Sequence, residues 1–253
     1  MPDKIDVSVI MPALNEAKNI ELAVGNSLAA FAEFGLEGEI IVIDDGSRDG
    51  TGEIVRRLAE KDARVRLLRH ETPRGIGASF WDGEAAARGS AVVMLPGDNE
   101  NDPSEIFRYH RVLEQVDIVI PFIFNKQARS LFRNGLSFAY RFIINTTFLV
   151  NFNYTNGTVL YRKSVLDTLD FHSTGFFFQT DILVRLVRAG YLFAEVPYRL
   201  GMRKEGVSKA VTFPSLMQVI KGYRRLARDQ YFHKHPAEHY PDDSQTLKRR
   251  SDS

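Results

Sequence analysis

The first 122 residues alternate between short apolar runs and longer amphipathic stretches. Each apolar run has the length of a strand and is stopped by proline, glycine or acidic residues. The five runs cover residues 6–12, 38–47, 65–70, 90–98 and 117–122. The stretches between them carry apolar residues at helical spacing. Strands separated by single helices predict an α/β fold, a mostly parallel central sheet with helices on both faces.

This alternation ends near Asn125, where helical stretches begin to dominate. The last of them has apolar residues at helical spacing and many basic residues. Beyond it the chain is polar and interrupted by prolines, a composition typical of disorder. We therefore expect one domain, a C-terminal amphipathic basic helix and a disordered tail, with bounds 1–210, 211–234 and 235–253.

Composition narrows the class of protein. Apolar residues at 44% and charged residues at 26% are ordinary for a soluble globular protein. The absence of cysteine excludes disulfide scaffolds and thiolate sites, and a net charge of +1 gives no general attraction to nucleic acid. The N-terminus lacks a signal-peptide pattern, and the apolar stretch 138–150 is interrupted by Arg141 and is too short to span a bilayer. We expect a cytoplasmic protein, with peripheral contact at the inner face of the membrane as an alternative.

Acidic clusters follow two of the predicted strands. Asp44 and Asp45 close the second strand, and Asp98 opens a cluster with Glu100 and Asp102 after the fourth. In open parallel sheets, ligands collect at the carboxyl ends of the strands. Carboxylates there accept hydrogen bonds from a ribose or a base, and they also bind Mg²⁺ or Mn²⁺. The alternative is that these residues only form turns and cap helices.

Three more segments offer groups to an anionic ligand. A predicted helix opens on Arg74 and Gly77, which supply a cation and allow close backbone approach to an anion. Gln179 and Asp181 lie at the start of another helix, two residues apart, so they do not share a helix face. The basic segment 199–209 contains a glycine and is suited to closing over phosphate oxygens, although a solvated turn is the alternative.

The order of these motifs resembles one known family. The stretches "VIMPALNEAKNI", "IIVIDDGSRDGT", "RGIGASFWDGEAAARG", "PGDNENDP", "TNGTVLYRKSVLD" and "FQTDILVRLVRAGY" follow one another within residues 5–210. They are similar to those of family-2 inverting glycosyltransferases with the GT-A (nucleotide-diphospho-sugar transferase) fold, and closest to polyprenyl- or dolichyl-phosphate mannose or glucose synthases. The resemblance implies transfer from a UDP- or GDP-sugar to a polyprenyl phosphate or a glycan, in the synthesis of cell-envelope polysaccharide or glycolipid.

The resemblance also assigns residues to the nucleotide-sugar, from the end of the first strand to the basic loop. These residues are Pro12, Leu14, Glu16, Asp44, Asp45, Arg74, Gly77, Asp98, Arg203, Ser208 and Lys209.

The implied metal site departs from the family pattern. Asp98 matches the last aspartate of the Asp-x-Asp motif and Gln179 a further metal position, but Pro96 stands where the first aspartate would be. Proline has no side-chain oxygen, so we expect Asp98 to be the main carboxylate ligand of Mg²⁺ or Mn²⁺, completed by Gln179 and diphosphate oxygens. Compensation by Glu100 or Asp102, and a reaction without metal, are the alternatives.

The acceptor decides which groups the chemistry needs. Transfer by in-line displacement makes Asp98 catalytic, because it stabilises the departing diphosphate. A sugar hydroxyl needs a general base, and the resemblance places a catalytic carboxylate at Asp181. A lipid phosphate is already anionic and needs none; arginines would then hold it, and the candidates are Arg129, Arg133 and Arg141.

The basic residues near the C-terminus indicate a possible partner besides the sugar donor and the acceptor. Residues 199–234 hold nine lysines and arginines against Glu205 and Asp229, so the last helix is suited to an anionic membrane surface. Packing on the catalytic domain or in a homodimer is the alternative. Two rival functions remain at this point: a nucleotidyltransferase, and a non-catalytic nucleotide-sugar binding protein. The missing acid at Pro96 is what keeps the second rival open.

Overall fold

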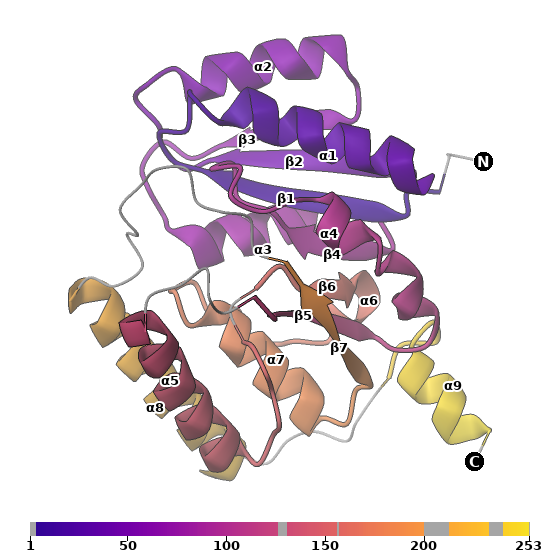
Figure 1. Ribbon diagram of the computed structural model, residues 1–253, viewed down its shortest axis with the longest axis vertical. Helices are drawn as coiled ribbons and strands as arrows, with labels where there is room; N and C mark the ends of the chain where they lie inside the picture. The colour runs from indigo at the N-terminus through magenta and orange to yellow at the C-terminus, as the bar shows by residue number, and fades with distance from the viewer. Residues whose placement is uncertain (1–3, 126–130, 156, 200–212, 233–239, 253) are drawn as a thin grey trace.

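A computed structural model describes residues 4–125, 131–155, 157–199, 213–232 and 240–252 (Figure 1). The strands are β1 (Val7–Ala13), β2 (Gly38–Asp44), β3 (Val65–Arg69), β4 (Ala91–Met94), β5 (Ile118–Ile123), β6 (Leu160–Arg162) and β7 (Phe193–Tyr198). The helices are α1 (Ile20–Phe34), α2 (Thr51–Lys61), α3 (Ile76–Ala86), α4 (Ser104–Phe107), the 3₁₀ helix η1 (His110–Glu114), α5 (Leu131–Phe148), α6 (Lys163–Leu166), α7 (Phe178–Arg188), α8 (Phe213–Phe232) and α9 (Gln245–Ser251).

The strands form one seven-stranded sheet in the order β3-β2-β1-β4-β6-β5-β7. β1 pairs in parallel with β2 and β4, β2 with β3, and β5 with β7. β6 runs antiparallel to its neighbours β4 and β5. The predicted mostly parallel sheet is therefore confirmed, and its one reversed strand comes from the region where the sequence pattern had lost its regular alternation.

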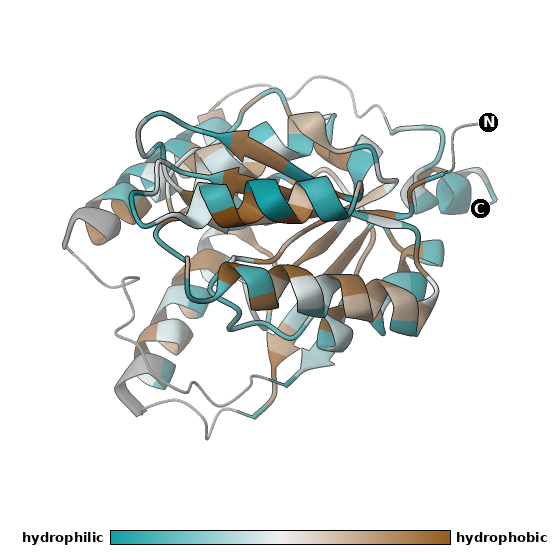
Figure 2. Cartoon of the chain, turned by 90° about the horizontal axis from the view of Figure 1, so that it is seen from above, coloured by the Kyte–Doolittle hydropathy of each residue, from teal (hydrophilic) through white to brown (hydrophobic). Residues whose placement is uncertain are grey.

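Helices cover both faces of this sheet because successive strand side chains point to opposite sides. Val9 packs into a core with α1, α2 and α4, while the next residue, Ile10, packs into a core with α3, α5, α7 and α8. Figure 2 shows the apolar strands enclosed between helices that carry hydrophilic residues on their outer sides. Full burial of such an aliphatic side chain contributes about 1.5–3 kcal/mol, so both layers are held by apolar packing.

The sheet brings six strand ends to one edge. β1, β2, β3 and β4 are parallel, and β5 and β7 point the same way because β6 reverses direction against both β4 and β5. The register places Ala13 opposite Asp44, and Asp44 opposite Arg69. This edge lies at the left of Figure 1, and α5 and α8 begin on the same side. A ligand site at the strand ends would thus draw on both halves of the fold.

The helical stretch predicted between the fourth and fifth apolar runs is broken into α4 and η1. Tyr109 leaves helical geometry with φ −102° and ψ 6°, and its amide bonds to Ile106 O at 3.0 Å, a three-residue turn. In a continuous α-helix, Phe107 and Leu113 would lie about 120° apart around the axis. The break allows both side chains to be buried in the same core.

The structure differs from the predicted disorder of the C-terminal tail. Residues 245–251 form α9, capped by Ser244, whose hydroxyl accepts a hydrogen bond from the Thr246 amide at 3.1 Å. The buried Asp117 carboxylate accepts hydrogen bonds from Ser244 Oγ at 2.9 Å, from the Gln245 amide at 2.8 Å and from Thr246 Oγ1 at 2.5 Å. Composition could not reveal this because the partner lies more than 120 residues away.

Candidate active site

Hydrogen bonds between side chains and backbone join the loops after β1 and β2. Asn15 adopts φ 58°, and its amide bonds to Ser47 Oγ at 2.9 Å. Its side chain accepts from the Arg48 amide at 3.0 Å, and the Glu16 amide donates to Thr51 Oγ1 at 2.9 Å. These bonds fix the half-buried segment of Pro12, Leu14 and Glu16 against the "DGSRDGT" turn.

The two aspartates at the end of β2 are buried and have different roles. Asp44 Oδ1 accepts from the Ser47 amide at 2.9 Å, and its Oδ2 lies 3.5 Å from Arg69 Nε. A Cβ on Gly52 would lie 2.6 Å from Asp44 Oδ2, so only glycine lets this carboxylate lie so close to the start of α2. Asp44 therefore shapes the turn that the family resemblance assigns to nucleotide binding. Forming this turn does not exclude a role of the same loop in binding a ligand.

Asp45 organises the loop that opens α3. Its Oδ1 accepts from His70 Nδ1 at 2.7 Å and from the Arg74 amide at 2.7 Å, and its Oδ2 accepts from the Gly75 amide at 2.9 Å. Burial alone would raise the pKa of Asp45, but these hydrogen bonds outweigh it and hold the pKa below its ordinary value. Asp45 is thus an ionised support for the Arg74 loop.

A second carboxylate, on α3, completes this support. His70 Nε2 lies 2.9 Å from Asp82 Oδ2, and Arg74 NH1 donates to the same oxygen at 2.6 Å. Arg74 is exposed, so its guanidinium lies at the surface next to the strand ends. The roles of His70 and Asp82 were not predicted from the sequence. The available signal was a histidine directly after a strand, at a carboxyl end where polar side chains gather.

Gly77 is buried, and the structure gives a packing reason for it. A Cβ there would lie 2.5 Å from the carbonyl oxygen of Thr174. The same segment accepts a hydrogen bond from Trp81 Nε1 to Ser173 O at 3.1 Å, and His172 stacks on Trp81 with ring centroids 3.9 Å apart. The close backbone approach that the structure shows at Gly77 is to another segment of this chain, the one that leads into α7. The approach of an anion to Gly77 stays a prediction.

Replacing Gly77 by alanine is expected to lower the free energy of unfolding by about 1–3 kcal/mol, because the new methyl group overlaps a backbone carbonyl that cannot rotate away. Gly25→Ala on α1 is the matched control, because no atom lies within 4 Å of its added Cβ. It should raise the stability by about 0.5–1 kcal/mol. Urea denaturation of both variants measures the difference, and equal stabilities would contradict the packing at Thr174.

The loop after β4 brings Asp98 next to the end of β1. The Gly97 amide bonds to Pro12 O at 3.0 Å, and a Cβ on Gly97 would lie 2.7 Å from Ile20 Cδ1, so glycine lets this loop pack closely against the side chain of Ile20. Asp98 follows directly and is half-buried, with its Oδ1 accepting from the Glu100 amide at 3.1 Å. The loop therefore places one carboxylate beside the Pro12 segment.

Within the described ranges, no group of three His, Cys, Asp or Glu side chains is arranged to hold a metal ion. Pro96 has no side-chain oxygen, so the loop after β4 offers a metal ion few protein ligands. A protein site with one carboxylate suits a hard cation only when a ligand phosphate supplies further oxygens.

Gln179 and Asp181 lie on the first turn of α7 and have separate partners, as their spacing predicts. Gln179 Nε2 donates to Gly157 O, and Arg185 Nε donates to Asp181 Oδ1. Arg185 also donates to Asp229 Oδ2 on α8 at 2.8 Å. Asp181 is 2% exposed, and its Oδ2 has no hydrogen-bond partner in the part of the chain that is described.

Burial raises the pKa of Asp181 above its ordinary value, against the opposing effect of the Arg185 charge. A raised pKa and an unsatisfied oxygen are features of functional carboxylates, but this one also joins α7 to α8 through Arg185.

Most of the basic residues predicted to bind phosphate are not tested by the structure. Arg129, Arg203, Ser208 and Lys209 lie outside the described residues, and so does the side chain of Arg133. Arg141 donates from NH1 to Asn153 O at 3.0 Å, and its guanidinium lies over Phe138, 5.6 Å from the ring centroid. It therefore has partners within its own domain.

The fold and the acidic strand ends define a class of protein. Residues 8–170 match the model of the family "Glycosyl transferase family 2", so the chain belongs to this family and is a glycosyltransferase. It is 31% identical to the polyprenol monophosphomannose synthase of Mycolicibacterium smegmatis over 220 residues, covering 79% of each chain. It is 28% identical to the dolichol-phosphate mannosyltransferase of Mycosarcoma maydis, covering 86% of this chain and 79% of that protein.

Solved structures support the fold. The UDP complex of glucosyl-3-phosphoglycerate synthase from Mycobacterium tuberculosis superposes with a TM-score of 0.68 at 22% identity, covering 88% of this chain and 80% of the other. The same enzyme has been solved with Mg²⁺ and UDP, with a TM-score of 0.66 at 21% identity, covering 88% and 79%. These comparisons confirm the predicted family and the GT-A fold.

Proposed function

We propose that the protein transfers a sugar from a UDP- or GDP-sugar to a polyprenyl phosphate with inversion at the anomeric carbon. The observation that carries this proposal is the 31% identity to a polyprenol monophosphomannose synthase across most of both chains. A phosphate oxygen of the lipid attacks the anomeric carbon while the bond to the diphosphate oxygen breaks. The electron pair leaves with the nucleoside diphosphate, and no proton has to be removed.

The residues at the strand ends suit the donor in this reaction. The fixed loops of Pro12, Asp44 and Asp45 carry carbonyl and carboxylate groups, which are suited to accept the hydrogen bonds that a nucleoside donates. The exposed Arg74 guanidinium lies beside them and suits the diphosphate. Arg203, Ser208 and Lys209 would add donors over the same group, with Arg129, Arg133 and Arg141 assigned to the acceptor phosphate.

A divalent cation fits this donor set. Mg²⁺ commonly binds through one or two carboxylates and substrate phosphates while keeping several waters. Asp98 is one half-buried carboxylate at a strand end, and Gln179 would be a second protein ligand. When bound, the cation would neutralise negative charge on the departing diphosphate.

Asp181 would act as a general base only with the alternative acceptor, a glycan hydroxyl. Such an acceptor must lose a proton, and a carboxylate whose pKa is raised by burial suits that task. A lipid phosphate requires no base, which agrees with the position of Asp181 in an ion pair with Arg185.

The test is product analysis with matched donors and acceptors. The purified protein is incubated with UDP-glucose, UDP-galactose or GDP-mannose, with undecaprenyl phosphate, an oligosaccharide or 3-phosphoglycerate as acceptor. We expect nucleoside diphosphate release that depends on the lipid phosphate and equals the glycolipid formed. Pyrophosphate release would instead indicate a nucleotidyltransferase, and tight donor binding without any turnover a binding protein; either result contradicts the proposal.

A further inference from the structure

Helices α5 and α8 are joined side by side at one end of the molecule (Figure 1). Thr147 Oγ1 and Tyr223 OH are hydrogen-bonded at 2.8 Å, and the rings of Phe148 and Tyr223 meet edge to face with centroids 5.8 Å apart. Tyr231 OH also donates to Thr147 O. Their inward sides hold buried core residues, among them Ile144 and Leu226. The pair is thus a fixed unit of the fold.

The outward sides of both helices are apolar as well. Phe138 and Phe142 are 59% and 61% exposed, and their rings stack with centroids 6.4 Å apart. Leu216, Met217 and Ile220 on α8 are 42–53% exposed. Single exposed apolar residues are ordinary, but several on each of two helices that are joined to one another favour an interaction surface. We call these five side chains the paired-helix face.

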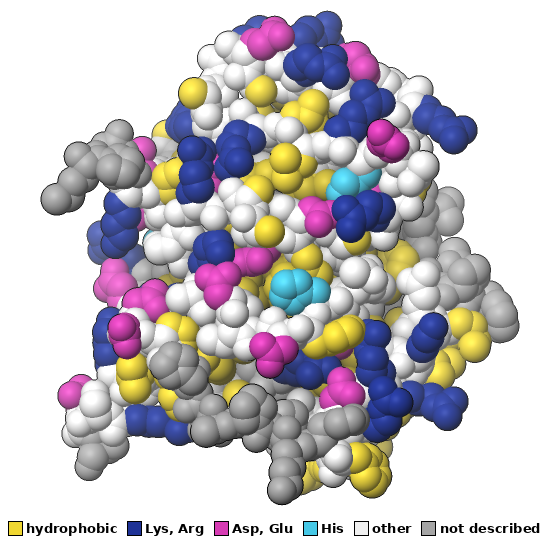
Figure 3. Space-filling view, turned by 180° about the vertical axis from the view of Figure 1, so that it is seen from behind, with side chains coloured by type: hydrophobic (Ala, Val, Ile, Leu, Met, Phe, Trp, Pro, Cys, Tyr) yellow, Lys and Arg dark blue, Asp and Glu magenta, His cyan; other side chains and the backbone are white. Residues whose placement is uncertain are grey.

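The exposed charges that α8 contributes beside this face are all positive. Residues 131–148 contain no aspartate or glutamate. On α8, Lys221, Arg224 and Arg228 are exposed, whereas Asp229 is directed to Arg185 at 2.8 Å. Figure 3 shows basic and hydrophobic side chains together at the lower right, where α8 lies. An apolar face bordered by cations complements a bilayer with anionic headgroups.

The position of the face fits a lipid acceptor. α5 follows the end of β5, and α8 follows the end of β7. Both strands point to the edge where Asp45 and Asp98 lie. A bilayer seated on the paired-helix face would therefore lie beside the site. In the described part of the chain, no helix is long and apolar enough to cross a membrane.

We propose that the paired-helix face and the three exposed cations of α8 form a docking surface for an anionic lipid bilayer. This inference rests on the proposed function, because docking on a bilayer would bring a membrane-embedded acceptor close to the strand ends. It goes further by assigning the contact to α5 and α8 together, because the aromatic part of the face is on α5. The surface binds lipid whether or not the nucleotide-sugar is present.

Vesicle flotation of the full chain tests the proposal. Vesicles contain phosphatidylcholine with or without phosphatidylglycerol, and neither donor nor acceptor is present. We expect Phe138→Ser/Phe142→Ser on α5 and Lys221→Gln/Arg224→Gln/Arg228→Gln on α8 each to weaken binding to anionic vesicles at least about 10-fold, through lost apolar area and lost charge attraction. Neutral vesicles should bind the wild type weakly.

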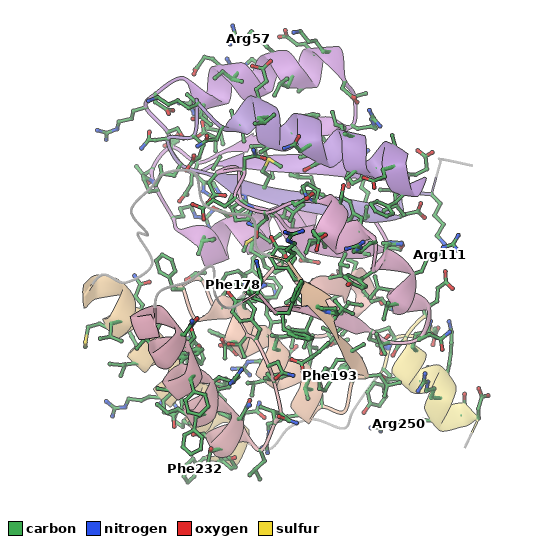
Figure 4. The ribbon with its side chains drawn as sticks, viewed as in Figure 1. Arg57, Arg111, Phe178, Phe193, Phe232 and Arg250 are labelled. Carbon is green, nitrogen blue, oxygen red and sulfur yellow. The ribbon has the colours of Figure 1, made fainter. Side chains whose placement is uncertain are left out.

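Matched controls lie on the other face of the sheet. Leu22→Ser on α1 removes an apolar side chain that is 58% exposed, and Arg57→Gln removes an exposed cation of α2 (Figure 4). Both should leave flotation unchanged, and circular dichroism should show all variants folded. Undiminished flotation of both test variants overturns the proposal. The proposal is also overturned if the wild type is a dimer that the α5 variant dissociates while this variant still binds vesicles. A second copy of the chain would then be the partner that covers the face.

A water-soluble short-chain polyprenyl phosphate separates this proposal from the proposed function. The α5 and α8 variants should use this acceptor as well as the wild type does, and lose activity only with long-chain acceptor in vesicles. Vesicle binding without any transfer would disprove the glycosyl-acceptor assignment and leave the docking surface intact.

Discussion

Replacing Asp98 by asparagine is expected to lower the turnover number for sugar transfer by at least about 100-fold. Asparagine preserves the size of the side chain and the acceptor for the Glu100 amide, but it removes the negative charge. Because Pro96 stands in place of the first acid, Asp98 is the one carboxylate left in the Asp-x-Asp motif. Because the charge acts on the departing diphosphate, kcat should fall much more than KM for the donor rises.

Two neighbouring acids provide controls for Asp98. Glu100 is exposed, and Asp102 Oδ1 accepts a hydrogen bond from the Ser104 amide at 2.9 Å at the start of α4. Glu100→Gln and Asp102→Asn remove the same charge a few residues away and should keep most of the activity. Calorimetry with nucleoside diphosphate should show that Mn²⁺ strengthens binding in these controls and not in Asp98→Asn. Loss of activity in a control would mean that its acid compensates for Pro96.

The strand ends were predictable from the sequence because they depend on local signals. Each buried run stops at a polar turn, and parallel strands must bring their carboxyl ends to one edge. Asp44, Asp45 and Asp98 could therefore be placed at a common edge before their contacts were known. Periodicity alone left these residues open between turn formation and ligand binding. The family resemblance then assigned them to the nucleotide-sugar, and that assignment stays a prediction.

The partners of these residues were not predictable because they are tertiary. Asp45 bonds to His70 and to the Arg74 loop, 25 to 30 residues along the chain. Asp181 bonds to Arg185 one turn on, but the network continues to Asp229, 44 residues from Arg185. Spacing on one helix predicts a face, and only the packing of α7 against α8 shows which groups fill it.

The C-terminal segment gives the clearest case of a tertiary effect. Residues 235–253 have few large apolar side chains, so composition favours disorder. One buried acid changes this outcome, because Asp117 offers the start of α9 a full set of hydrogen-bond acceptors. Arg162 Nε donates to the same carboxylate at 3.1 Å from the other side. The carboxylate of Asp117, directly before β5, therefore holds α9 in place more than the helix propensity of residues 245–251 does.

Asp117→Asn is expected to lower the free energy of unfolding by about 3–5 kcal/mol, because the amide replaces one of the two acceptor oxygens by a donor that faces other buried donors, and it leaves the Arg162 charge without its buried counter-charge. Equilibrium urea denaturation measures the loss. Asp243→Asn is the matched control, because Asp243 is half-exposed and 3.7 Å from Arg162; it should change stability by less than about 0.5 kcal/mol. A double-mutant cycle with Thr246→Val should give a coupling of at least about 1 kcal/mol. No coupling would show that the hydrogen bond from Thr246 Oγ1 contributes nothing to the cost.

The loss should also depend on pH in a defined direction. Burial would raise the pKa of Asp117, but the hydrogen bonds from Thr246, Gln245 and Ser244 outweigh it and hold the pKa below its ordinary value. A lowered pKa stabilises the folded state above the unfolded value of about 4, and that stabilisation is lost as the pH falls through the folded pKa. The difference between wild type and Asp117→Asn should thus be largest near neutral pH and shrink in acid. A difference that stays constant down to pH values below the folded pKa would mean that the carboxylate charge contributes nothing to holding α9.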